Sequence, residues 1–203
     1  MNLKEFQLSA SRTIPSQMDQ VAQVDRMQQG LAFADIPVDL VINGQSPLIN
    51  GTHALMGFVD ELSELNMAIN KMDLTNVREE LGDFFWYLQL ACYAHTIPMQ
   101  NLDKYVCTFN GVEHTAQELV EDLMHHIGLY ASLLKKTTFY GKDADNPSHI
   151  LAQIYYALAY ICVYYEFELH EILQENQDKL KARYPEKFTE QDAIERKDKE
   201  DGQ

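Results

Sequence analysis

The sequence predicts an all-α fold, a helical bundle that consists of two related halves. Apolar residues recur at helical spacing along most of the 203 residues. Only one short segment, around Asn43-Gly44, has the composition of a β-hairpin. A shift of 70 positions also aligns two helical segments, residues 79–102 and residues 149–172, with similar apolar patterns. The halves are therefore interpreted as an internal duplication, a pseudo-dimer of two helical repeats in one chain.

The N-terminal region predicts two helices followed by a loop. A short helix covers residues 3–12, and a Gln-rich helix runs over residues 16–34 with Ser16 as its N-cap. Residues 35–51 contain two prolines and two Asn-Gly pairs, so we expect a loop that could hold a small hairpin.

The first repeat contains two helices, each with an acidic pair beside its core face. One helix follows residue 51, and its predicted core stripe is Phe58, Leu62, Leu65, Ile69 and Met72. The next begins after the sequence "DLT", and its stripe is Val77, Leu81, Phe84, Leu88 and Cys92. Glu61 and Glu64 border the first stripe, and Glu80 and Asp83 border the second. The spacing of three residues points both carboxylates of a pair to one side of the helix.

The second repeat keeps the core pattern and lacks the acids. A helix over residues 115–134 carries the stripe Ala116, Val120, Leu123, Ile127, Tyr130 and Leu134. A polar loop covers residues 135–148, and one long helix covers residues 149–173. At the 70-residue shift, Glu80 corresponds to Ile150 and Asp83 corresponds to Gln153.

We divide the chain into four regions of one compact unit: residues 1–51, 52–109, 110–196 and a flexible tail at 197–203. The net charge of −15 argues against a basic face for nucleic acid or anionic membranes. The longest apolar segment, residues 150–165, is shorter than the ~20 residues of a membrane span. The N-terminus has no signal-like apolar run, and the three cysteines lie among apolar residues, so we expect a cytoplasmic protein. No P-loop or Gly-rich dinucleotide motif is present.

The four carboxylates predict a metal site. Lysine and arginine are absent four residues after each of them, where Leu65, Ala68, Phe84 and Tyr87 stand. Several carboxylates in one partly dry cleft repel one another unless a cation compensates them. Oxygen ligands on two facing helices suit Mg²⁺, with Mn²⁺ as the alternative, and such a site would let an acidic protein accept a polyphosphate.

At these residues the chain resembles a known family. Glu61-x-x-Glu64 followed by "REELGDFFWYL" resembles the ExxE and ExxD signature of the MazG-like, all-α nucleoside triphosphate pyrophosphohydrolases, a superfamily that includes the dimeric dUTPases. Two later stretches resemble the same family: the lysine-rich segment "KKTTFYGKD" and the segment of residues 172–196, with its N-x-x-K-L-x-x-R-Y-P pattern.

The resemblance implies a MazG-like helical bundle that hydrolyses a (deoxy)nucleoside triphosphate, with Mg²⁺, to the monophosphate and pyrophosphate. It implies that the metal ligands and catalytic residues are Glu61, Glu64, Glu80 and Asp83, one of which, or the neighbouring Glu79, helps to deprotonate water. The substrate contacts it implies are Asn176, Lys179, Arg183, Lys136, Lys142 and Tyr87. Lys179 and Arg183 are four residues apart and would share one helix face.

The chain departs from the family pattern in one respect. A typical member carries its acids and its Asn-Lys-Arg segment in the same repeat, and two subunits pair to complete the sites. Here the first repeat has the acids and the second has the basic segment. We therefore expect one composite site in a fused pseudo-dimer, which could itself pair as a homodimer.

Two alternatives remain open at this stage. A di-iron carboxylate bundle also uses carboxylates on facing helices, but it needs Glu-x-x-His pairs, and only Asp122-x-x-His125 approaches that pattern. A helical nucleotide-binding or scaffold protein without turnover would share every other feature. Base and sugar specificity are not encoded in the acidic motif.

Overall fold

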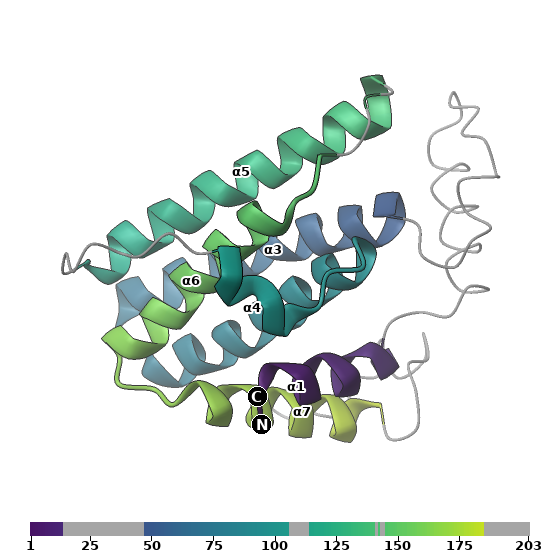
Figure 1. The fold of residues 1–203 in the computed structure, drawn as a ribbon. Coiled ribbons are helices and arrows are strands. Elements are labelled where there is room, and N and C mark those ends of the chain that lie inside the picture. The colour runs from purple at the N-terminus through teal and green to yellow at the C-terminus, as the bar shows by residue number, and fades with distance from the viewer. Residues whose placement is uncertain (14–46, 106–113, 141, 143–144, 185–203) are drawn as a thin grey trace.

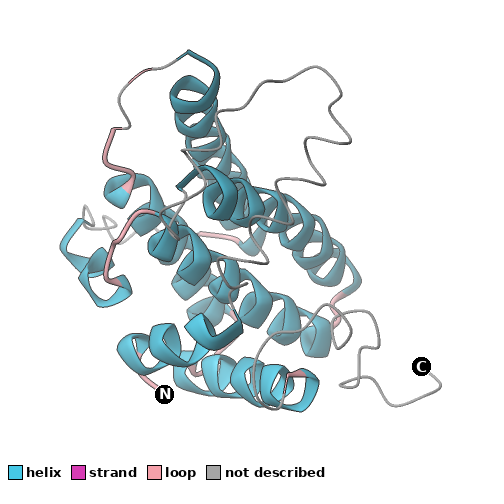
Figure 2. Ribbon diagram, turned by 90° about the vertical axis from the view of Figure 1, so that its right-hand side faces the viewer, coloured by secondary structure: helices cyan, strands magenta, loops and turns pink. Residues whose placement is uncertain are grey.

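The computed structural model describes residues 1–13, 47–105, 114–140, 142 and 145–184, and these residues form helices without any strand (Figures 1 and 2). The all-α prediction is therefore confirmed. The helices are α1 (Leu3–Ala10), the 3-10 helix η1 (Ser11–Thr13), α3 (Pro47–Lys71), α4 (Leu74–Ala94), the 3-10 helix η3 (Met99–Tyr105), α5 (Ala116–Tyr140), α6 (Ser148–Tyr164) and α7 (Leu169–Arg183).

Two helical hairpins form the body of the bundle. α3 packs along α4, and α5 packs along α6 (Figure 1). α5 also contacts α3, and α4 contacts both α6 and α7, so the two hairpins share one core. α1 lies beside α7 at the edge of the bundle, where it also contacts η3. This arrangement places α7 against α4, the helix that carries Glu80 and Asp83, two of the four predicted site acids.

Local sequence signals explain where the helices begin. Asn2 and Glu5 form a capping box at α1, in which the Glu5 N–H donates to Asn2 Oδ1 over 2.9 Å. Asp73 caps α4 by accepting from the Asn76 N–H over 3.2 Å. α3 begins at Pro47, a residue whose fixed φ suits the first helical position.

The buried faces match most of the predicted stripes. All five stripe residues of α4 and all six of α5 are buried, which confirms both stripes. On α3, Phe58 and Leu65 are fully buried. Met72 is the exception, because its side chain is 84% exposed. It stands past the end of α3 with φ at 55°, the left-handed conformation that ends many helices, so the α3 stripe stops before it.

Four predicted boundaries were wrong. The loop was expected to extend to Gly51, yet Asn50 and Gly51 lie inside α3. Gly51 packs against α5, where an added Cβ would lie 3.0 Å from a Leu134 methyl group, so tertiary packing overrides the turn preference of Asn-Gly. The predicted loop of residues 135–148 is helical up to Tyr140, since no residue before Gly141 breaks the helix.

The third wrong boundary is the helix expected over residues 149–173. It is divided into α6 and α7, which meet at an angle of 105°. Glu166 lies between them with φ at 58° and ends α6. The first predicted helix, over residues 3–12, is also divided, into α1 and η1. The helix predicted over residues 16–34, the hairpin at Asn43-Gly44 and the C-terminal tail lie outside the described residues.

The ends of α4 and α6 repeat the same backbone geometry at the 70-residue shift. Thr96 and Glu166 both adopt positive φ, at 55° and 58°. The Ile97 N–H donates to the Cys92 carbonyl over 2.8 Å, and the Phe167 N–H donates to the Cys162 carbonyl over 2.8 Å. The packing is reciprocal as well, because α4 contacts α7 and α6 contacts η3. The similarity of the halves therefore extends from sequence pattern to backbone hydrogen bonding.

In the described part of the chain, no single helix is both long and apolar enough to cross a bilayer. α6 and α7 reach that length and composition only together, as a bent pair.

Candidate functional site

Three of the four predicted acids come together between α3 and α4. One carboxylate oxygen from each of Glu61, Glu64 and Glu80 can be chosen so that all three lie within 4.8 Å of one another. Glu61 is buried, with 8% of its surface exposed, whereas Glu80 is half-buried and Glu64 is exposed. The group is thus closed on the protein side by Glu61 and open to solvent at Glu64.

Burial makes this group unfavourable when it is fully ionised. Burial raises the pKa of Glu61, and the charges of Asp83, Glu80 and Glu64 raise it further. Burial likewise raises the pKa of Glu80. The two side chains share a hydrogen bond, in which protonated Glu61 donates to Glu80. Glu61 Oε2 is nevertheless buried without a hydrogen-bond partner. A cation between these oxygens would satisfy that atom and remove the repulsion.

Asp83 does not join the three glutamates, because both of its oxygens bond to α7. Asn176 Nδ2 donates to Asp83 Oδ1 over 2.7 Å, and Lys179 Nζ donates to Asp83 Oδ2 over 2.5 Å. Lys179 also donates to Glu79 over 3.3 Å. Burial lowers the pKa of Lys179, but its pairs with Asp83 and Glu79 outweigh burial and raise it. Lys179 therefore carries a positive charge beside the acidic group.

Gly82 allows α7 to approach α4 this closely. A Cβ at Gly82 would lie 3.1 Å from the Cβ of Asn176, which is tighter than ordinary contact. Asn176 is 4% exposed, and its Oδ1 is a second buried oxygen without a hydrogen-bond partner. An isolated glycine in a helical pattern is a sequence signal for such close packing, although it does not identify the helix that approaches.

Tyr87 forms the wall of the acidic group on the side of α3. Its ring occupies the place that a Cβ at Gly57 would take, so only glycine fits there. His53 and Trp86 contact the same ring edge to face, with centroids at 5.8 Å and 4.9 Å. Burial raises the pKa of Tyr87, and the charge of Glu61 raises it further, so the phenol stays protonated beside the carboxylates.

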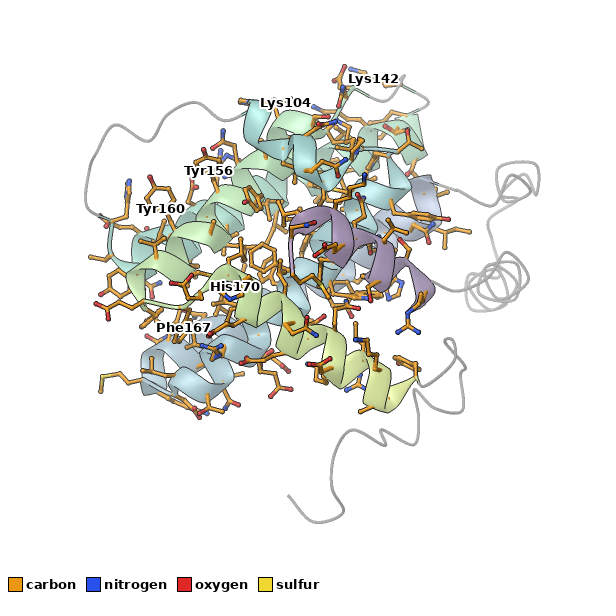
Figure 3. The ribbon with its side chains drawn as sticks, turned by 60° about the horizontal axis from the view of Figure 1, so that its bottom comes forward. Lys104, Lys142, Tyr156, Tyr160, Phe167 and His170 are labelled. Carbon is orange, nitrogen blue, oxygen red and sulfur yellow. The ribbon has the colours of Figure 1, made fainter. Side chains whose placement is uncertain are left out.

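Of the other predicted contacts, one lies near this region and two do not. Arg183 ends α7 one turn after Lys179, with its guanidinium 6.0 Å from the Tyr184 ring centroid. Lys136 lies near the C-terminal end of α5 and Lys142 lies just past that end, where its N–H donates to the Lys136 carbonyl. This end of α5 packs beside Gly51 at the start of α3. Glu61 is ten residues further along α3, about 15 Å away at helical rise. Figure 3 also shows Lys142 at the opposite end of the molecule from Phe167.

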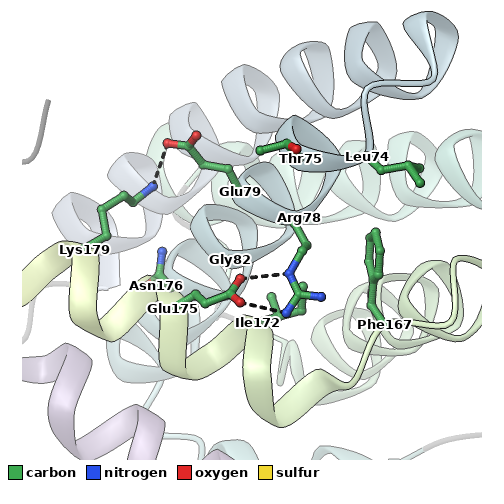
Figure 4. Close-up of a pocket in the computed structure, with 10 residues that line it drawn as sticks. All are labelled: Leu74, Thr75, Arg78, Glu79, Gly82, Phe167, Ile172, Glu175, Asn176 and Lys179. Atoms are coloured by element: carbon green, nitrogen blue, oxygen red, sulfur yellow. Dashed lines mark hydrogen bonds and ion pairs between the residues drawn. The ribbon is translucent and has the colours of Figure 1, made fainter. Parts of the chain in front are cut away.

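Sequence reasoning missed a cavity of about 440 Å³ between α4 and α7 (Figure 4). Leu74, Thr75, Arg78, Glu79 and Gly82 line it from α4, and Ile172, Glu175, Asn176 and Lys179 line it from α7, with Phe167 at one end. Arg78 donates to both Glu175 oxygens, over 2.8 Å and 2.9 Å, and to Glu171 over 3.0 Å. The spacing of Glu171 and Glu175, one helical turn apart, is the sequence signal that could have predicted a cationic partner.

The described residues give no support to a di-iron centre. The one group of three or more metal-type side chains found among them contains carboxylates only. Asp122 pairs with His126 at 3.4 Å on the surface of α5, while His125 is exposed.

Comparison with known proteins agrees with the chemistry of this group. Residues 51–101 match the family model of the MazG nucleotide pyrophosphohydrolase domain. No curated protein and no solved structure gave a significant match. The matched segment contains most of α3, all of α4 and the beginning of η3, and with them all four predicted acids. The resemblance to the MazG-like superfamily is therefore confirmed over residues 51–101, at the level of a nucleotide pyrophosphohydrolase domain.

Proposed function

We propose that this protein hydrolyses a nucleoside triphosphate between its α and β phosphates, releasing the monophosphate and pyrophosphate with Mg²⁺ as cofactor. The observation that carries the proposal is the set of charges gathered around α4. Three converging carboxylates lie there beside a largely buried lysine of α7 that is already held by a fourth carboxylate.

The side chains present fit a divalent cation. Glu61, Glu64 and Glu80 would hold it, since all three offer oxygen and Glu61 Oε2 has no other partner. An all-oxygen donor set favours Mg²⁺ or Mn²⁺ over metals that prefer nitrogen or sulfur. When bound, the ion would neutralise charge on the phosphoryl oxygens and lower the pKa of a coordinated water.

The remaining residues would position substrate and move protons. Lys179 can transfer one of its hydrogen bonds from Asp83 to a phosphate oxygen, because both are anionic acceptors in reach of the same ammonium. Arg183 would meet the distal phosphates from the next turn of α7. One of the predicted acids, or the neighbouring Glu79, would accept a proton from the attacking water.

The site is composite in our proposal. The first half supplies the acids and the second half supplies Asn176, Lys179 and Arg183. The repeated helix ends at Thr96 and Glu166 support descent of the halves from one duplicated unit. The chain would then be a fused pseudo-dimer that keeps one site of two, and a stoichiometry of two bound nucleotides per chain would contradict it.

Product analysis tests the function directly. The purified chain would be incubated with Mg²⁺ and a panel of ribo- and deoxynucleoside triphosphates, and the products resolved. We expect monophosphate and pyrophosphate, with turnover lost in Glu80→Gln. Asp178→Asn is the matched control, since Asp178 is an exposed acid of α7 whose partners in the described part of the chain are Gln174 and Lys181 of the same helix. Binding of nucleotides without any turnover would instead favour a helical nucleotide-binding protein.

A further inference from the structure

We infer that the cavity between α4 and α7 binds the nucleoside portion of the substrate and favours bases that carry an exocyclic amino group. The inference rests on the proposed function, because it assigns the phosphates to the acidic group and Lys179. The volume of about 440 Å³ lies within the range of small-molecule sites.

Two side chains of α7 connect the cavity with the proposed phosphate site. Asn176 and Lys179 line it, and the same two side chains bond to Asp83. From Lys179 the lining follows α7 back to Ile172, seven residues or about 10 Å at helical rise. Figure 4 shows this path, with Lys179 at one end and Phe167 at the other. A ligand with its phosphates at Lys179 would place its sugar and base along this path.

The charges of the lining favour an uncharged group. Arg78 is held by Glu171 and Glu175, and Lys179 is held by Asp83 and Glu79. A phosphate in the middle of the cavity would have to approach Glu79 and Glu175. A neutral base avoids that repulsion and can bury its ring against Leu74, Phe167 and Ile172.

Glu175 provides the preference among bases. Its two oxygens accept from Arg78, and a carboxylate has about four acceptor positions, so capacity remains for a second donor. The Arg78 guanidinium is fixed over the Phe167 ring, with its central carbon 5.2 Å from the ring centroid, which holds the pair in place. A carboxylate acceptor complements the amino group of cytosine, adenine or guanine. Uracil and thymine carry carbonyl oxygens in place of that amino group and offer only one ring N–H as a donor there, so we expect them to bind more weakly.

Calorimetric binding tests this inference without relying on turnover. The probes are dCMP, dAMP, dGMP, dUMP and inorganic pyrophosphate, each with Mg²⁺. In the wild type we expect at least one amino-bearing monophosphate to bind more tightly than dUMP. Glu175→Gln should weaken that ligand about tenfold, the effect of losing a hydrogen bond to a charged group. Pyrophosphate affinity should stay unchanged, and Asp178→Asn should alter neither.

A second variant separates the cavity from any displacement of α7. Thr75 is exposed at the cavity lining, so Thr75→Trp should fill the space without disturbing the core. We expect it to abolish binding of the monophosphates and leave pyrophosphate binding intact. Unchanged monophosphate binding in Thr75→Trp would overturn the inference while the proposed function stands. Equal affinity of the wild type for dUMP and the other three would overturn the base preference. If the wild type binds none of the probes but still hydrolyses nucleoside triphosphates, the inference fails and the proposed function stands, whereas absence of both binding and turnover would remove the proposed function.

Discussion

The two halves of this chain share features of one backbone plan and differ in the side chains that it carries. α3 and α5 each contain 25 residues, and α4 and α6 end in the same hydrogen-bonding pattern. Yet Glu80 in the first half corresponds to Ile150 in the second, which packs against the core. This helical plan therefore tolerates either a carboxylate or an apolar side chain at the same place. The chemistry resides in the side chains and in what compensates their charge.

The two halves also complement each other in charge where α4 meets α7. The first half concentrates carboxylates whose pKa values are raised by burial, at Glu61 and Glu80. In the second half, the side chains of Lys179 and Asn176 donate hydrogen bonds to Asp83, the fourth predicted acid. Part of the charge that α4 carries is thus balanced by α7.

The largest expected effect lies in the acids of the first half. Glu61→Gln removes the most buried oxygen donor, so turnover should fall on the order of 10³-fold, about 4 kcal/mol of transition-state stabilisation. Gln153→Ala, at the second-half counterpart of Asp83, should leave turnover unchanged. Steady-state turnover of the wild type and both variants, measured with saturating Mg²⁺, tests this prediction. Equal losses in both variants would mean that the second half retains a site.

A smaller effect is expected from the glycines that accommodate aromatic packing. Gly57→Ala places a methyl group inside the Tyr87 ring position, so the free energy of unfolding should fall by about 2–3 kcal/mol. A methyl group at Gly128, on α5 of the second half, would meet nothing within 4 Å. Gly128→Ala should therefore stabilise the protein by roughly 0.5–1 kcal/mol through helix propensity. Urea unfolding measures both, and destabilisation by Gly128→Ala would contradict this expectation.

The pH dependence of stability should reveal the uncompensated acids. Glu61 and Glu80 have raised pKa values when folded, so the native protein binds more protons than the unfolded chain. Their contribution is complete below the ordinary carboxyl value of 4.5 and is lost as the pH rises through the folded pKa values, about 7 for Glu80 and about 9 for Glu61. Without metal, we expect the free energy of unfolding to fall by roughly 1–2 kcal/mol between pH 5 and 8, allowing for solvent screening at half-exposed Glu80.

Two controls assign that pH dependence to the acidic group. Mg²⁺ should reduce it, because the cation replaces the protons as the compensating charge. Glu61→Gln should reduce it in the absence of metal. If neither Mg²⁺ nor Glu61→Gln changes how the free energy of unfolding depends on pH, the dependence arises from other carboxylates.

The smallest effect tests the contact between the halves. Gly82→Ala should displace Asn176 by a few tenths of an ångström and cost about 1 kcal/mol. We expect the KM for nucleotide to rise several-fold with little change in kcat, since the acids themselves are not moved. A fall in kcat at constant KM would instead place Asn176 in the chemical step.

The sequence alone was sufficient to predict which helix faces are buried and that Glu61, Glu64 and Glu80 lie together. Apolar spacing predicted the stripes of α4 and α5 because burial on one face imposes that period. It failed where a helix ends at a residue that carries no local signal. Glu166 adopts positive φ without being glycine, so nothing at that residue separates α6 from α7. At the matching position of the first half, Thr96 stands two residues before Pro98, and this proline signals the end of α4. A helix end at Glu166 could be predicted only by aligning it with Thr96 at the 70-residue shift.

The partners of the acidic group were less predictable than the group itself. Asp83 was expected among the metal ligands, and its spacing from Glu80 is right for that role. Its bonds to Asn176 and Lys179 depend on the bend before α7, which brings residues more than ninety positions apart together. The cavity depends on the same long-range packing, so Arg78 and Glu175 were not recognised as a pair.

The contact between Lys179 and Asp83 has a consequence for how the protein responds to dilution. Both residues belong to one polypeptide, so their effective concentration is set by the tether between them rather than by the amount of protein present. This pairing persists in a solution so dilute that separate subunits would dissociate. It also cannot be exchanged between molecules, so a defect at either residue cannot be rescued by mixing in chains that are intact there.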